Sequence, residues 1–338
     1  MRKNEMRVIR EYVIPRIITY IAVIFIGITI SFILPRLTPL DPVILAINRF
    51  SEYGQYYDPE SLELMIESMK ELYGLKGSLL EQYVNFLRRA ITGDFGPSLA
   101  YFPIPATHLV SRALPWTISL LSLSTIVSWL VGNFIGGVAG YFGGRRWAKA
   151  LSVFATVVYP TPYYIMALLL MAVLTYVIPI FPTYGATSLD PAFTLKFIAD
   201  YFYHATLPSL SLVIVGYGWW FLSMRNIVLH TKQEEYVEYG QMMGLPKRTI
   251  LLKYVIRNSL LPQITGLSVA LGGIFSGSMI TEAVFSYPGL GYVLLTSVTN
   301  GDFNLMMAIV TYSIIAVSSA TVLLDLLYPL IDPRIRYK

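Results

Sequence analysis

Long uncharged stretches alternate with shorter polar ones along this chain, and their lengths indicate how it folds. A helix needs about 20 mostly apolar residues to cross roughly 30 Å of hydrocarbon. Six stretches reach that length, so we expect an all-α integral membrane protein with six transmembrane helices. The six lie at 17–34, within 113–144, and at 150–178, 207–224, 263–283 and 305–327.

Prolines decide the shape of the third stretch. The uncharged run continues over 150–189, which is too long for one helix, and Pro179 and Pro182 stand where we expect it to end. Pro160 and Pro162 lie inside the run, and they predict a kink in the helix.

Two polar segments have helical patterns of their own. The segment at 36–112 is too long for a simple connection, and "DPESLELMIESMKELYG" within it places Leu62, Met65, Ile66 and Met69 on one helical face. We expect a small helical cap there. The stretch "KFIADYFYHATLP" predicts a short aromatic helix at the membrane interface, ahead of the fourth span.

Composition agrees with a membrane protein. Hydrophobic residues make up 55% of the chain and charged residues 13%, against about 25% charged in soluble domains. The net charge of +5 comes from basic residues flanking apolar spans, so contact with membrane lipid explains it better than nucleic acid does. The absence of cysteine excludes disulfides, thiolate metal sites and cysteine nucleophiles, and leaves the redox compartment undetermined.

The positions of lysine and arginine predict the orientation, because positive residues in short loops stay on the cytoplasmic side. With the N-terminus inside, 17 of the 25 basic residues face the cytosol. The predicted organisation is a cytoplasmic N-terminus with the first helix (1–35), an extracytoplasmic loop domain (36–112), a core of five transmembrane helices (113–331) and a cytoplasmic tail (332–338). We therefore expect a multi-pass protein of the cell membrane with both termini in the cytosol.

One cytoplasmic segment, "EEYVEYGQMMGLPKRTILLKYVIRN", is both polar and patterned. Helical spacing places Tyr236, Tyr239, Gly240 and Met243 on one face, with Glu238 on the opposite side. Gly244 is expected to end this helix with a positive φ, and the next helix then begins at the following proline and runs to about 258.

The tyrosine and methionine face has two interpretations. It can lie on the membrane surface among lipid headgroups, or it can fill a groove in another protein. The acidic opposite face argues against the membrane surface, where lysine and arginine are usual. The residues by themselves leave both interpretations open.

The same segment resembles the cytoplasmic loop of ABC importer permeases, whose pattern is Glu-Ala-Ala, three residues, then Gly. Glu238, Tyr239 and Gly240 occupy the first three positions and Gly244 the last, so the two alanines are not matched. "GLPKRTILLKYVIRNSLLP" is similar to the B-type permease subunits of dipeptide and oligopeptide importers. Further similarities are "YGLKGSLLEQYVNFLRRAITGDFGPSL", "TEAVFSYPGLGYVL" and "DLLYPLIDPRIRYK".

This resemblance implies a type I ABC importer permease fold and a pathway-forming subunit for peptides or similar small solutes, such as oligosaccharides or metal chelates. It implies four kinds of partner: a second homologous permease, two cytosolic ATPase subunits, an extracytoplasmic binding protein and membrane lipid. The segment at 230–262 would be the coupling loop, with Tyr236, Glu238, Tyr239, Gly240, Met243 and Gly244 as coupling residues. The loop at 36–112 would meet the binding protein near Asp94. No phosphate-binding loop is present, so we expect neither cofactor nor enzyme activity in this chain.

Two acids and two glycine-rich stretches have alternative interpretations. Glu282 and Asp325 lie near predicted span ends, where they can be structural partners of other groups or can take part in gating or the pathway. "GNFIGGVAG" and "GLSVALGGIFSGS" favour close helix packing, with a pore-facing surface as the alternative. The three histidines share no metal-ligand spacing.

The main functional alternative is a secondary transporter or channel that is not driven by ATP. Such a protein would need paired ionisable groups or a filter loop at mid-membrane, and neither is evident in the sequence. An intramembrane enzyme ranks last, because no catalytic cluster occurs at membrane depth.

Overall fold

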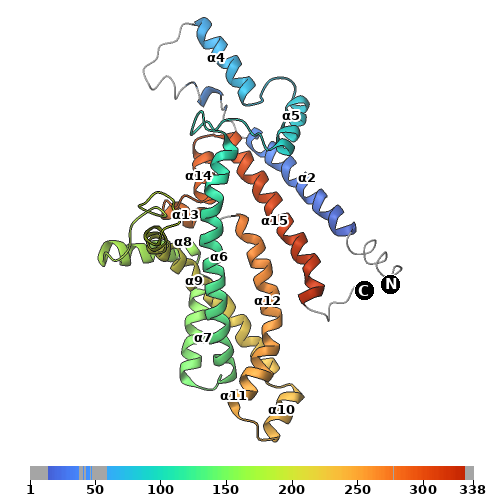
Figure 1. Cartoon of the computed structure of the whole chain (residues 1–338), viewed down its shortest axis with the longest axis vertical. Coiled ribbons are helices and arrows are strands. Elements are labelled where there is room, and N and C mark those ends of the chain that lie inside the picture. Colours follow the sequence, from blue (N-terminus) through green and yellow to red (C-terminus); the bar gives the residue numbers. More distant parts are fainter. Residues whose placement is uncertain are drawn as a thin grey trace.

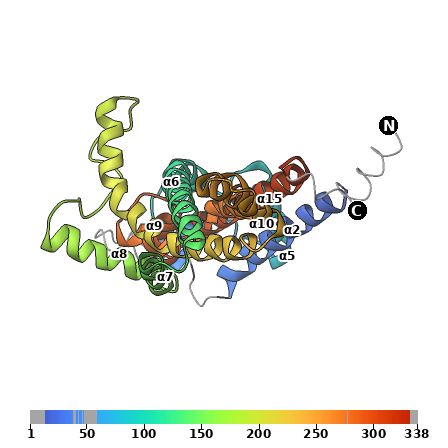
Figure 2. The same cartoon turned by 90° about the horizontal axis from the view of Figure 1, so that it is seen from below.

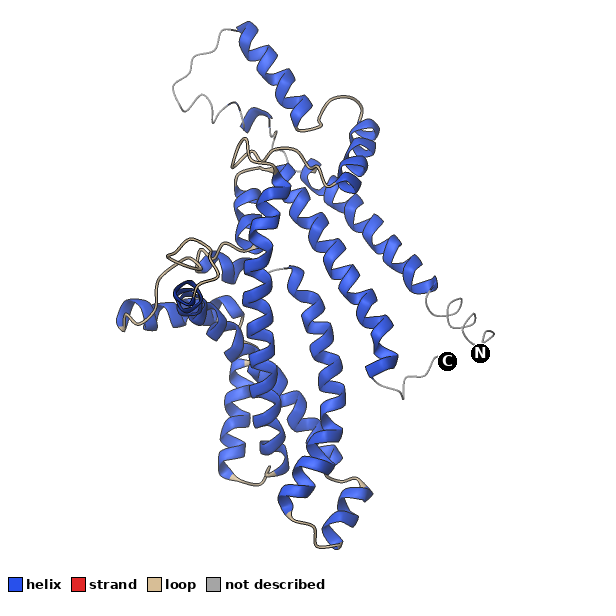
Figure 3. Cartoon of the chain, viewed as in Figure 1, coloured by secondary structure: helices blue, strands red, loops and turns tan. Residues whose placement is uncertain are grey.

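The structure is a computed structural model that describes residues 14–37, 41, 43–45, 47, 59–276 and 278–331. Within these residues every regular element is a helix, which confirms the all-α prediction for this part of the chain. Figure 3 shows the helices in blue, joined by loops. The start of the predicted cytoplasmic N-terminus, 1–13, and the predicted tail, 332–338, lie outside the described residues.

Four helices among the described residues are long and apolar enough to cross a membrane. They are α2 (Ile14–Arg36), α6 (Ala106–Tyr141), α9 (Leu195–Thr231) and α15 (Phe303–Ile331). They correspond to the first, second, fourth and sixth predicted spans. The separate aromatic helix predicted before the fourth span is wrong, because α9 runs through this segment without a break. In Figure 2 the yellow-green start of α9 projects sideways from the other helices.

The third predicted span is sharply bent. Helix α7 (Arg146–Val158) is followed by α8 (Tyr163–Met171) and the π-helical η2 (Ala172–Val177), and the chain bends by 102° between α7 and the α8–η2 arm. The break falls at Pro160 and Pro162, as predicted. Proline ends the first arm because it has no backbone N–H to donate and its ring clashes with the preceding turn.

The fifth predicted span, 263–283, has different limits in the structure. The helix starts much earlier, with α11 (Lys247–Thr249), the π-helical η3 (Ile250–Ile256) and α12 (Arg257–Gly272), and then gives way to the 3₁₀ turn η4 (Gly273–Ser276). The short helices α13 (Met279–Val284) and α14 (Leu290–Thr299) follow. The predicted limits were wrong because the helix that begins at Lys247 continues directly into the span, whereas adjacent glycines weaken the helix at its far end.

Helices α6 and α9 form the most extensive helix pair, and three glycines let them approach closely. Gly132, Gly136 and Gly140 recur every four residues along α6 and face α9. A Cβ at Gly136 would lie 2.5 Å from the carbonyl oxygen of Phe221 and 2.9 Å from its Cα. These contacts support the packing interpretation of "GNFIGGVAG", because small residues bring helix backbones together in lipid.

Helices α2 and α15 run side by side, and both share a buried apolar cluster with the first turns of α6 (Figure 1). Tyr20 and Ser319 share a hydrogen bond of 3.0 Å between their hydroxyl oxygens. Near the ends of the two helices, Arg16 Nη1 lies 2.6 Å from the Asp325 carboxylate. Ile314 packs against Gly27, where a Cβ would come within 2.8 Å of the isoleucine Cδ1.

The outer segment contains α4 (Pro59–Leu72) and α5 (Leu79–Thr92), at the opposite end of the molecule from α10 (Glu235–Met242) (Figure 1). The predicted apolar face of α4 is confirmed, because Met69 is buried and Leu62, Met65 and Ile66 are half-buried, whereas their neighbours are exposed. Phe95 of "GDFG" is buried between Phe86 and Tyr312. The contact of the Phe95 ring with Tyr312 connects the loop after α5 to α15.

Candidate functional site

Helix α10 ends in a glycine turn that fixes the direction of the chain. The Leu245 N–H donates to the Gly240 carbonyl at 3.2 Å, and the Gly244 N–H donates to the Gln241 carbonyl at 3.0 Å. This pair of hydrogen bonds is the Schellman motif, which needs a left-handed residue after the helix. Gly244 has a φ of +72°, which confirms the predicted positive φ.

The buried side of α10 differs from the prediction. Val237 and Gly240 are buried, and a Cβ at Gly240 would meet Leu245 Cδ1 at 3.5 Å. Val237 joins an apolar cluster with residues of α6, α9 and η3, namely Tyr141, Met224, Val228, Ile250 and Val255. Gly240 therefore lies on the face that packs against the chain's own helices, and its placement on the outward face was wrong.

The outward surface of α10 carries three large side chains that we call the α10 knobs, Tyr239, Met242 and Met243, with the exposed Glu238 beside them. The α10 knobs are 64%, 79% and 78% exposed, respectively. Tyr236 is less exposed, and its hydroxyl accepts a hydrogen bond of 3.2 Å from Asn258 Nδ2. Sequence reasoning missed Met242. Val237, the one β-branched residue of the helix, was the signal that would have identified the inward face.

The helix ends that α10 packs against are joined by hydrogen bonds. Lys232 Nζ donates to the Tyr141 carbonyl at 3.2 Å, which joins the end of α9 to the end of α6. Ser259 Oγ donates to Thr231 Oγ1 at 3.1 Å, which joins α12 to α9. From the elbow at Gly244, the helical path α11–η3–α12 continues to Gly272. Helix α10 therefore packs on helix ends that are themselves joined to one another.

Farther along the same helices, α6, α9 and α12 enclose an open hollow of about 930 Å³ together with the α7–α8 bend. Its described lining combines aromatic rings, small residues and hydroxyl groups, and none of those residues is Asp, Glu, Lys, Arg or His. The Tyr159 and Trp219 rings, 45% and 52% exposed, lie 5.6 Å apart between centroids. Gly218 allows this arrangement, because a Cβ there would lie 3.0 Å from the Tyr159 Cα. The hollow can hold a small solute without pairing any charge of its own.

The sequence could not reveal this lining, because its residues come from five separate elements. Ser124, Thr125 and Ser128 line it from α6, and Gly266 and other small residues from α12. The signal in the sequence was the concentration of serine, threonine and glycine in spans that are otherwise aliphatic.

Glu282 is fully buried in α13, and its carboxylate has several partners. One oxygen accepts from Thr117 Oγ1 at 2.9 Å, and the other accepts from the backbone N–H groups of Gly291 and Tyr292 at 2.7 and 3.2 Å. It caps the first turn of α14, where a negative charge is stabilised by the helix dipole. A Cβ at Gly289 would collide with this carboxylate. These contacts support the structural alternative for Glu282, which is not among the described residues lining the hollow.

Asp325 also has a partner within the chain. Its carboxylate forms the ion pair with Arg16 that connects α15 to the start of α2. It lies on a different helix pair from the hollow and is not among its described lining residues. The structure thus does not bring the two acids together, and the ion pair supports a structural role here as well.

Asp94 occupies an exposed turn in the outer segment. Its Oδ1 accepts a hydrogen bond of 3.0 Å from the Gly96 N–H, and it stands between Gly93, the left-handed residue that ends α5, and the buried Phe95. The carboxylate is therefore presented outward by a turn whose two sides are anchored.

Comparison with known proteins gives consistent matches. Residues 132–337 match the family described as "Binding-protein-dependent transport system inner membrane component". The oligopeptide transport system permease protein AppB of Bacillus subtilis (strain 168) is 28% identical over 327 residues, which cover 96% of this chain and 99% of AppB. OppB of Haemophilus influenzae, an oligopeptide transport system permease protein, is 28% identical over 331 residues, 97% of this chain and 99% of OppB. The glutathione transport system permease protein GsiC of Escherichia coli (strain K12) is 27% identical over 331 residues, with the same coverage.

Proposed function

From the premise that this chain belongs to the family of inner membrane components of binding-protein-dependent transport systems, we propose that it forms one wall of a pathway for peptides. The family consists of permease subunits of ABC importers, and the ATPase is carried by separate subunits. Peptides are the proposed cargo because AppB and OppB are oligopeptide permeases and GsiC serves glutathione, itself a small peptide.

The observation that carries this proposal is the hollow between α6, α9 and α12. Its volume of about 930 Å³ lies near the upper end of the 300–1,000 Å³ typical of small-molecule sites, so it can hold a short peptide. An uncharged lining that contains hydroxyl groups and aromatic rings can contact peptides with different side chains without strongly retaining any one of them. A secondary transporter is disfavoured, because coupling to ions needs ionisable groups that the described lining does not supply.

The partners follow from the two ends of the molecule. We place α10 in the cytosol against an ATPase subunit, with the α10 knobs filling a groove in that partner. The exposed arginines and lysines near this end, among them Arg145, Arg146 and Lys247, agree with a cytoplasmic location. The outer segment would then face the binding protein, near Asp94. A second permease and a second ATPase complete the proposed complex.

The uptake experiment uses the complex of this chain with its second permease, ATPases and binding protein, reconstituted in liposomes. We expect ATP-dependent uptake of labelled short peptides. Trp219→Ala should lower the rate by about five- to tenfold, as the loss of roughly 1 kcal/mol of aromatic contact predicts. Trp147→Ala is the matched control, because Trp147 is similarly exposed but lies on α7 outside the hollow. Uptake that persists without ATP would contradict the importer, and equal uptake by both variants would contradict the pathway.

Sidedness has a separate test, because the chain contains no cysteine. Met242→Cys and Asp94→Cys each introduce one exposed thiol, at opposite ends of the molecule. In intact spheroplasts that contain this chain without the ATPase subunits, a membrane-impermeant maleimide should label the cysteine at 94 and should label that at 242 only after lysis. Labelling of both before lysis would overturn the proposed topology.

A further inference from the structure

Helix α5 buries only part of its apolar surface against the rest of the chain, and the remaining part is exposed. Phe86 is buried, and Tyr83, Leu87 and Ala90 are half-buried against α2 and α15. Next to them on the helix circumference lie Leu80, Val84 and Ile91, which we call the α5 stripe. These three side chains are 72%, 56% and 87% exposed.

The remaining arc of α5 is polar, with Glu81, Asn85, Arg88 and Thr92 exposed along it. Such a division into apolar and polar halves is typical of helices that lie in the plane of a membrane interface. Arg88 adjoins Val84 on the helix circumference, so a positive charge borders the stripe. A guanidinium at this position matches the phosphate groups of lipid headgroups.

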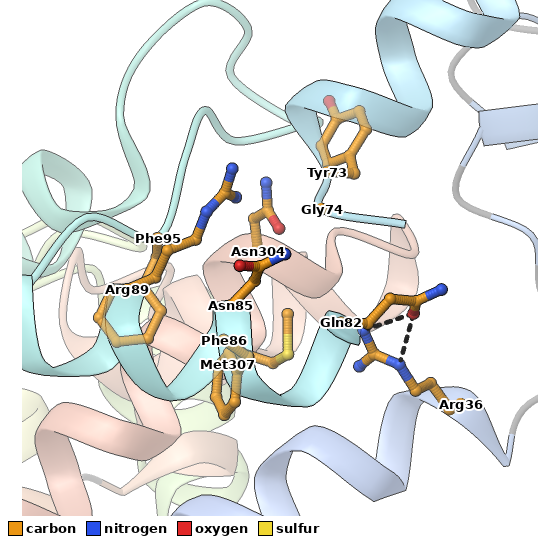
Figure 4. A pocket seen from close by; sticks show the side chains of 10 residues that line it. All are labelled: Arg36, Tyr73, Gly74, Gln82, Asn85, Phe86, Arg89, Phe95, Asn304 and Met307. Carbon is orange, nitrogen blue, oxygen red and sulfur yellow. Dashed lines mark hydrogen bonds between the residues drawn. The ribbon is translucent and has the colours of Figure 1, made fainter. Parts of the chain in front are cut away.

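Contacts with α2 fix the depth at which α5 lies. At the end of α2, the Arg36 guanidinium donates to Gln82 Oε1 at 3.3 and 3.4 Å (Figure 4). Two turns earlier, the Thr29 hydroxyl shares a hydrogen bond of 2.7 Å with the Tyr83 hydroxyl. Seven residues separate Thr29 from Arg36, which is about 10 Å along a helix. Helix α5 therefore lies beside the last two turns of a transmembrane helix and not above its end.

The same two turns of α2 present apolar side chains outward. Ile30, Ile33 and Leu34 are 52%, 45% and 56% exposed, and α2 has a mean hydropathy of 2.6. In a helix of this composition these side chains contact lipid. The α5 stripe belongs to a helix that packs beside these turns, so the lipid that surrounds α2 there is the nearest apolar partner for the stripe.

We propose that α5 is an interfacial membrane helix on the outer side of the bilayer, with the α5 stripe among the lipid chains and Arg88 at the level of the phosphates. This contact would hold the outer segment at a fixed height. Because α5 ends at Gly93, directly before Asp94 and Phe95, it would also set the position of the loop proposed to meet the binding protein.

Site-directed spin labelling tests the proposal, since the chain has no native cysteine. Leu80→Cys and Ile91→Cys probe the stripe, and Asn85→Cys on the polar arc is the matched control. Each nitroxide-labelled chain is reconstituted in its complex in phosphatidylglycerol–phosphatidylcholine liposomes. We expect collisions with oxygen at 80 and 91 to exceed those with a water-soluble nickel chelate severalfold, and the opposite preference at 85.

Two results would overturn the proposal. Access of the nickel chelate to 80 and 91 equal to that at 85 would place the stripe in water. Protection of 80 and 91 from both reagents would show that protein covers it, such as the second permease or the binding protein. Peptide uptake measured in the same liposomes separates these outcomes from a failure of the proposed transport function.

Discussion

Serine substitution of the three α10 knobs together, Tyr239, Met242 and Met243, is expected to abolish nearly all ATP-driven uptake while membrane insertion stays normal. All three side chains project from the molecule, so their loss leaves the chain's own packing intact. Truncation of one central aromatic anchor in a protein interface costs roughly 2 kcal/mol, about thirtyfold in affinity. Co-purification of the ATPases, stimulated ATP hydrolysis and uptake are measured in parallel.

Gln241→Ser is the matched control for these knobs, because Gln241 is exposed on the same helix and carries no large apolar group. It should retain coupling. Normal assembly and uptake in the triple variant would eliminate the groove interpretation and favour a helix lying on the membrane surface.

Gly240→Trp is a poor probe of docking, because Gly240 is buried and the substitution would disturb α10 itself. Gly244→Val strains the left-handed elbow by about 1–2 kcal/mol.

Gly136→Leu is expected to prevent α6 and α9 from packing and so to remove most of the folded protein. The new Cβ would collide with backbone atoms of Phe221. Backbone atoms of a helix cannot rotate away from a collision, whereas the end of a flexible side chain can. The two helices must therefore separate, and overpacking of this kind costs roughly 3 kcal/mol or more. Thermal unfolding in detergent and the yield of monodisperse protein measure the effect.

Gly144→Leu provides the comparison for this change. Gly144 lies in the loop after α6, and a Cβ there has no neighbour within 4 Å. This variant should unfold at nearly the same temperature as the unchanged protein. If Gly136→Leu matched it in yield and unfolding temperature, the close α6–α9 contact would not be essential to the fold.

The path of the chain from the α10 knobs to the lining of the hollow explains how movement at α10 can reach the hollow. The chain leaves α10 at Gly244 and continues as α11, η3 and α12, and α12 contributes Gly266, Val269 and Ala270 to the wall of the hollow. A packed helix moves as a rigid body when one end is displaced. In the proposed mechanism, closure of the ATPases would shift α10 and thereby move this wall.

Local chemistry was sufficient for much of the fold. The lengths of apolar runs identified α2, α6, α9 and α15, and Pro160 and Pro162 located the bend, because both depend only on residues near one another in the sequence. The same holds for the apolar face of α4 and for Gly244, where the left-handed turn requires a residue without a Cβ.

Tertiary structure decided the rest, because those features depend on groups far apart in the sequence. Helical spacing on α10 could not reveal which side faces inward, since Val237 is buried by η3 and the ends of α6 and α9, and Gly240 faces Leu245. Glu282 finds its hydrogen-bond partner Thr117 on another helix, 165 residues away. The hollow likewise exists only where α6, α9 and α12 come together. A periodic pattern specifies that a face is buried, but only packing determines what buries it.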